Sequence, residues 1–204
     1  MKEKIKYFLI ILSLLFCFIL VSMSSYASTI SHNLSDNFFR LHILANSNLD
    51  IDQELKLKVR DNIIEFMNNQ NFSNYSKQEV INFVSQNLNI YQEIAAATIA
   101  NEGFSYPVTV EIGNYLFPTK EYGNISLPAG YYDALRIKIG NADGENWWCS
   151  LFPPLCFVDI SSGVIDETAE SSLKNNLSNE EFAIIKNSNT PIKLKFKIVE
   201  LFSK

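Results

Sequence analysis

The first pattern along the chain is an apolar run close to the N-terminus. Residues 7–21 are apolar apart from Ser13, and lysines precede the run at positions 2, 4 and 6. A membrane-spanning helix needs about 20 apolar residues. A shorter run behind a positively charged segment is instead typical of a signal peptide. The pattern therefore predicts export.

The residues after this run predict where the signal peptide is cut. Ser25 and Ala27 place small side chains at the spacing that signal peptidase recognises, so cleavage is expected between Ala27 and Ser28. An uncleaved membrane anchor is the alternative. A lipid anchor on Cys17 is not expected, because Phe16 fills a position where lipoprotein signals need a small residue.

The mature chain opens with a polar segment, a strand and a helix. Residues 28–36 are rich in Ser and Asn and are interpreted as a tether. Residues 39–46 alternate with period two, with Phe39, Leu41 and Ile43 on the apolar face, which is typical of a strand. A helix is then expected to begin at Asp50, with Gln53 completing a capping box. Its apolar face is expected to contain Leu55, Val59, Ile63 and Phe66.

A second helical segment and a group of strands follow. Ser76 and Glu79 predict another capping box. Helical spacing then continues to Ile99, with a pause near Asn89 and a stop at Gly103. Further strands are predicted at residues 106–112, 115–117, 125–127, 131–139 and 192–201, with a turn at 113–114 and a third helix at 178–186.

Helices grouped before a run of strands indicate an α+β fold. We expect a single domain over residues 37–204, with two or three helices packed on a largely antiparallel sheet. The signal peptide (residues 1–27) and the tether (28–36) precede this domain. The initial β-α-α-β order leaves room for one parallel strand pairing.

The net charge of the chain narrows the classes of partner that it is expected to bind. The net charge is −5, and loss of residues 1–27 removes three lysines and one glutamate, which changes it to −7. Nucleic acids are bound mainly through Lys and Arg, so they are not expected as partners. Contact with a membrane is expected only through the signal peptide.

The segment from 140 to 159 contains the largest concentration of unusual residues. Cys149 and Cys156 lie seven positions apart. In an exported protein this pair indicates a disulfide, with two buried thiols as the alternative. A catalytic thiol would need a nearby base, and the pair lacks the short spacings of a zinc site.

The histidines offer little catalytic chemistry. His32 lies in the tether, and His42 lies on the less apolar face of the first strand beside Arg40 and Asn46. One interpretation is a hydrogen-bonded histidine beneath a neighbouring element, and the other is a polar patch that recognises a partner. No pair of carboxylates is placed together for acid–base chemistry. We therefore expect no catalytic activity, cofactor, metal or small-molecule substrate.

The aromatic residues of the same segment predict binding or packing. Both tryptophans of the chain are adjacent, so they face opposite sides if the segment is a strand. They could be core residues or interface anchors, or one could have each role. The predicted partner-binding residues are Arg40, His42, Asn46, Asn146, Trp147, Trp148, Phe152, Pro153 and Pro154.

Several blocks of sequence resemble the stage II sporulation protein R family. The most specific are Asn146-Trp-Trp-Cys149 and the Phe152-Pro-Pro-Leu-Cys156 block that follows it. The others are Arg40-Leu-His-Ile-Leu-Ala-Asn-Ser47, Leu55-Lys-Leu-Lys-Val-Arg-Asp61, Phe117-Pro-Thr-Lys120, Leu127-Pro-Ala-Gly130, Ala134-Leu-Arg136 and Phe196-Lys-Ile-Val-Glu-Leu201. Ala142 departs from the glycine expected in the family turn, which puts a left-handed conformation there in doubt.

The resemblance implies a signalling role in endospore formation. Such proteins are made in the forespore and exported into the space between the two membranes that separate it from the mother cell. There they activate a membrane-embedded aspartic protease of the mother cell, which then processes pro-sigma-E. An exported hydrolase that acts on the cell envelope is the alternative function.

Overall fold

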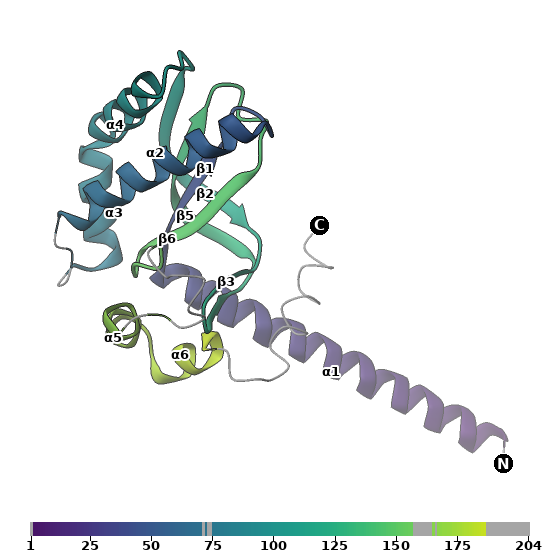
Figure 1. Cartoon of the computed structure of the whole chain (residues 1–204). Helices are drawn as coiled ribbons and strands as arrows, with labels where there is room; N and C mark the ends of the chain where they lie inside the picture. Colours follow the sequence, from purple (N-terminus) through teal and green to yellow (C-terminus); the bar gives the residue numbers. More distant parts are fainter. Residues whose placement is uncertain (1, 71, 73–74, 157–164, 166, 187–204) are drawn as a thin grey trace.

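The computed structural model describes residues 2–70, 72, 75–156, 165 and 167–186 (Figure 1). The elements in chain order are α1 (Lys2–Asn37), β1 (Phe39–Leu44), α2 (Asp50–Asn68), α3 (Lys77–Gln86), α4 (Leu88–Asn101), β2 (Val108–Phe117), β3 (Lys120–Tyr122), β4 (Ile125–Leu127), β5 (Gly130–Ile139), β6 (Asn146–Phe152), α5 (Glu167–Asn176) and α6 (Asn179–Ile185).

A four-stranded sheet with the order β2-β5-β1-β6 organises the domain. β1 runs parallel to β5 and antiparallel to β6, and β2 runs antiparallel to β5. A parallel pair needs a long crossover connection, and here α2, α3 and α4 lie between β1 and β5 in the chain. The α+β class, the largely antiparallel sheet and the single parallel pairing are confirmed.

Helices cover one face of this sheet. Leu41 and Ile43 of β1 are fully buried, and so are Val59 and Ile63 of α2. α2 also packs against α4, and α4 against β2 (Figure 1). The apolar face predicted for the first helix therefore forms part of the main core.

The opposite face is also covered over part of its area. The β3–β4 hairpin lies over this face, with Ile125 and Leu127 of β4 fully buried, and α6 contacts β4. Every residue of β1 up to Ile43 is buried. The sequence predicted a strand with a single apolar face, so burial of both faces is a difference, and it arises because the hairpin packs over the second face.

α1 is continuous through the predicted tether. Leu34 is fully buried, and the Lys77 Nζ donates to the Ser35 carbonyl at 3.1 Å. The last turn of α1 therefore packs against the domain. The helical segment from residue 4 to residue 25 is long and apolar enough to cross a membrane. N-terminal signal sequences can have the same length and composition. The boundaries at residues 27 and 36 stay predictions.

Several predicted helix ends are confirmed. Ser76 and Glu79 form the capping box of α3. Gly103 has a φ of 82° and ends α4, where the Phe104 N–H donates to the Ile99 carbonyl at 3.0 Å. This is the hydrogen bond of a Schellman motif, which favours glycine at this position.

Other local predictions were wrong. The N-cap of α2 is Leu49, which makes no side-chain cap, and Gln53 donates instead to the Ser47 carbonyl at 2.8 Å. The predicted turn at 113–114 lies inside the ten-residue strand β2. The helical pause occurs at Asn87, between α3 and α4, rather than near Asn89. α5 was not predicted, and the expected strand at 192–201 lies outside the described residues.

Candidate functional site

The candidate site is built on the strand β6. Asn146 to Phe152 form an edge strand paired with β1, which is the condition under which the two tryptophans were expected to face opposite sides. Its period-two pattern is hidden because both faces of the strand carry apolar residues. The strand places Trp147 and Trp148 on opposite faces of the sheet.

Trp147 faces α2. The Arg60 guanidinium carbon lies 4.2 Å from the centroid of the Trp147 ring, and Arg60 also forms an ion pair with Asp61 at 2.6 Å. The indole is half-buried, and its Nε1 has no hydrogen-bond partner within the described residues. Trp147 therefore packs between β6 and α2.

Trp148 lies on the other face of the sheet, against His42. The two rings stack with centroids 3.7 Å apart and planes at 16°. The Phe117 ring approaches Trp148 edge-on at 4.6 Å. Two neighbouring rings thus fix the orientation of this half-buried indole.

His42 has a neutral imidazole in this environment. Only 6% of the residue is exposed, and burial lowers its pKa to about 4, against the opposing effect of the hydrogen bond to Asn146. Nearby Arg136 and Arg40 lower the pKa further. The Nε2 lies 2.8 Å from the Asn146 Oδ1, which can only accept, so Nε2 carries the proton. A histidine held in this way supports Asn146 and Trp148.

Arg40 is completely buried, beneath the surface that the sequence predicted it to form. Its guanidinium carbon lies 4.2 Å from the Phe117 ring centroid and 4.8 Å from that of Tyr132. Its Nη2 donates to the Tyr122 Oη at 2.6 Å, and that hydroxyl donates to the Trp148 carbonyl at 3.2 Å. The buried Arg40 side chain therefore connects the β3–β4 hairpin to β6.

Asn46 orients the loop that leads into β6. Its Nδ2 donates to the Asp52 carboxylate at 2.8 Å, and its Oδ1 accepts from the Asn141 N–H at 3.0 Å. Burial raises the pKa of Asp52, but hydrogen bonds from Ser47 and Asn46 outweigh this effect and lower it. Ala142 in the same loop has a φ of 57°, so the left-handed turn is retained without glycine.

A disulfide closes the C-terminal end of β6. Cys149 and Cys156 are bonded, with their Cα atoms 5.1 Å apart, as the sequence predicted. Phe152 and Pro153 within this loop are buried, and Pro154 is half-buried. The disulfide holds the loop against the strand, and neither sulfur is a free thiol.

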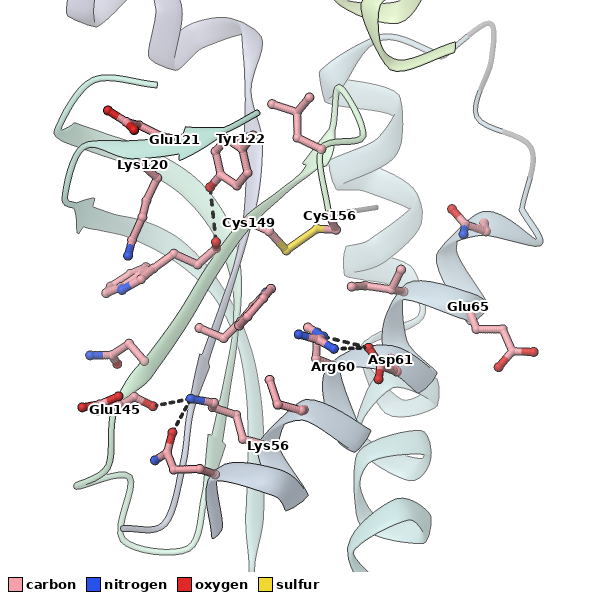
Figure 2. A pocket seen from close by; sticks show the side chains of 18 residues that line it. Lys56, Arg60, Asp61, Glu65, Lys120, Glu121, Tyr122, Glu145, Cys149 and Cys156 are labelled. Carbon is pink, nitrogen blue, oxygen red and sulfur yellow. Dashed lines mark hydrogen bonds and ion pairs between the residues drawn. A yellow bond between two sulfur atoms is a disulfide. The ribbon is translucent and has the colours of Figure 1, made fainter. Parts of the chain in front are cut away.

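A groove of about 820 Å³ lies between α2, β3 and β6 (Figure 2). We call it the β6 groove. Both tryptophans, the disulfide and Tyr122 line it, together with charged side chains of both signs: Lys56, Arg60, Asp61, Glu65, Lys120, Glu121 and Glu145.

The cations that α2 contributes to the groove were not singled out from the sequence. The Lys56 Nζ donates to the Gln53 Oε1 at 2.6 Å and to the Glu145 carbonyl at 3.0 Å, and burial lowers its pKa. Lys56 and Arg60 are four residues apart, so they lie on the same side of the helix. This spacing, compared with the positions of the apolar residues of α2, could have predicted that Lys56 and Arg60 share one side of the helix.

The groove has the properties of a binding surface. It combines rigid aromatic side chains with charged groups of both signs, and it is bordered by a disulfide-bonded strand. Within the described residues, no group of three or more His, Cys, Asp or Glu side chains could hold a metal ion. Of the predicted partner-binding residues, Asn146, Trp147 and Trp148 line the groove, while Arg40 and His42 support them from below.

Comparisons with known proteins show which family the chain resembles. A family model described as stage II sporulation protein R matches residues 35–162. A curated protein of Bacillus subtilis (strain 168), named stage II sporulation protein R, is 42% identical over 130 residues, which are 64% of this chain and 58% of that protein. The match thus spans somewhat more than half of the relative. No solved structure matches.

Proposed function

Because this chain belongs to the stage II sporulation protein R family and has a role in sporulation, we propose that it is an exported signal that acts by binding. Its proposed partner is a membrane-embedded aspartic protease of the mother cell, which then processes pro-sigma-E. The proposed site of action is the space between the forespore and mother-cell membranes. The apolar N-terminal helix supports export.

The observation that carries the proposal is the pair of half-buried tryptophans on a disulfide-bonded edge strand. Tryptophan is enriched among the residues that dominate binding energy at protein interfaces. Because the rings of His42 and Phe117 and the guanidinium of Arg60 already fix the two indoles, little side-chain entropy remains to be lost on docking.

The burial and hydrogen bonding of His42 argue against acid–base catalysis at the same place. A general base must lie within hydrogen-bond reach of the proton that it abstracts. Nε2 of His42 is occupied by Asn146, and Nδ1 is buried without a partner in the part of the chain that the structure describes. The site therefore favours recognition over hydrolysis of the cell envelope.

A binding experiment tests the proposal. The tagged exported protein is mixed with the extracytoplasmic part of the protease, and the dissociation constant is measured for the unmodified chain and for Trp148→Ala. Loss of one central anchor weakens an interface by about 2–4 kcal/mol, so we expect at least ~30-fold weaker binding.

Tyr131→Ala is the matched control, because Tyr131 is 64% exposed and does not line the groove. It should bind like the unmodified chain. Equal affinity of all three proteins, each with an unchanged melting temperature, would exclude the β6 groove as the contact surface. Release of soluble fragments from purified cell-wall material by the unmodified chain would support the hydrolase alternative instead.

A further inference from the structure

The two edges of the sheet differ in how their backbone groups are satisfied. At β6, the Trp148 carbonyl accepts from Tyr122 and the Ser150 carbonyl accepts from the Leu155 N–H at 3.0 Å. β2, at the opposite edge, pairs with β5 along all ten of its residues on its inner side.

The outer side of β2 has no hydrogen-bond partner in the described part of the chain. The Gly140 N–H donates to the Pro107 carbonyl at 2.8 Å, so odd-numbered residues of this stretch direct their backbone groups toward β5. The even-numbered residues direct theirs outward: Val108, Val110, Ile112, Asn114 and Leu116. A long edge strand with free backbone groups is a template for pairing with another strand.

Side chains at this edge are also incompletely covered. Val108, Val110 and Ile112 are only half-buried, whereas Leu135 and Ile137 on the adjacent strand β5 are fully buried. Leu116 is 51% exposed. β2 carries neither Lys nor Pro, the residues that commonly protect sheet edges.

We propose that two copies of this chain pair through β2, antiparallel and around a two-fold axis at Ile112. The register follows from the side chains. A two-fold axis at Glu111 would place like charges directly opposite each other, which is unfavourable. An axis at Ile112 instead places Glu111 opposite Gly113 of the second copy and keeps all five outward residues in the ladder.

The same register matches side chains in size and places no like charges directly opposite each other. Leu116 lies opposite Val108 of the second copy, which covers the most exposed apolar side chain of the strand. Glu111, the one charged residue of β2, is already paired with Arg136 at 2.6 Å and Lys138 at 3.1 Å within its own chain. In a two-fold interface the contact between Leu116 and Val108 occurs twice, so its contribution to binding is doubled.

The dimer would present two binding sites. β2 and β6 are the opposite edges of the sheet, so pairing through β2 leaves the β6 groove open in both copies. Two linked sites bind a partner anchored in a membrane with increased avidity. The dimer itself does not rest on the proposed function, since it concerns a different edge.

The test is the oligomeric state of the exported protein, recovered from the medium of an expression host and measured by sedimentation equilibrium over a range of concentrations. We expect a monomer–dimer equilibrium. Leu116→Lys should raise the dissociation constant of the dimer about tenfold or more, because the substitution acts twice. Tyr131→Lys is the matched control, since Tyr131 pairs with Leu116 in the ladder but belongs to the inner strand β5.

Cross-linking tests the register. Paired residues whose backbones exchange hydrogen bonds have Cα atoms about 5.5 Å apart, within the range for a disulfide. Ile112→Cys should therefore form an oxidised dimer, and Tyr131→Cys should not. A monomer at every concentration overturns the proposal. The proposal is also overturned if a dimer forms but Leu116→Lys does not weaken it and Ile112→Cys does not cross-link it.

Discussion

Acid is expected to destabilise the domain through His42. Burial lowers the pKa of this histidine from 6.5 to about 4 in the folded chain. Between these two values the unfolded chain binds a proton that the folded chain does not, so the free energy of unfolding falls as the pH falls. The stability is fully present above pH 6.5 and is lost progressively toward pH 4.

The size of the effect follows from the shift. A tenfold change in proton affinity corresponds to about 1.4 kcal/mol, so lowering the pKa from 6.5 to about 4 gives a loss of about 2–3 kcal/mol between pH 7 and pH 4.5. The structural cause is that a charged imidazole would be buried against Trp148 and would face Arg136 and Arg40.

Urea unfolding, followed by tryptophan fluorescence at pH 7 and pH 4.5, measures this loss. His42→Gln is the comparison, because glutamine cannot titrate and the variant keeps His32 and every carboxylate. The variant should lose about 2–3 kcal/mol less stability than the unmodified chain over this interval. Equal losses in the two proteins would refute the assignment of a buried, neutral His42.

Three further predictions concern other parts of the chain. N-terminal sequencing of the exported protein should begin at Ser28, and recovery of only full-length chain from membranes would contradict cleavage after Ala27. Reduction of the Cys149–Cys156 disulfide should lower the free energy of unfolding by about 2–3 kcal/mol, measured by denaturation with and without reductant. Ala142→Gly should raise the melting temperature and stabilise the fold by about 0.5–1 kcal/mol, because Ala142 has a positive φ. An unchanged or lower melting temperature would mean that this turn is not strained.

The sequence predicted features that depend on local chemistry. The Ser76–Glu79 box and the stop at Gly103 could be predicted because each is formed by residues within one turn of a helix. Strands such as β5 could be predicted because the alternation of apolar and polar residues is also a local pattern.

Features that depend on tertiary contacts were missed or misassigned. Gly113 and Asn114 have the composition of a turn, but pairing with β5 holds them inside a strand. Asp50 is a good capping residue, yet Asp52 makes the buried hydrogen bonds at the start of α2.

The candidate site was predicted only in part. The cysteine pair and the aromatic residues are visible as composition, so Trp147, Trp148 and the disulfide were identified. The burial of Arg40 was not predictable, because it depends on the Phe117 and Tyr132 rings and on Tyr122 from a hairpin about 80 residues away. The contribution of α2 to the groove likewise depends on how the helix crosses the sheet.

The most direct test of the central claim is processing of pro-sigma-E in sporulating cells that carry Trp148→Ala in place of the unmodified chain. Melting of the exported variant is measured in parallel, with Tyr131→Ala as the control. We predict that a Trp148→Ala variant which is exported and melts normally leaves pro-sigma-E unprocessed, while Tyr131→Ala allows normal processing. Normal processing in the Trp148→Ala strain would contradict a role of the β6 groove in activating the protease.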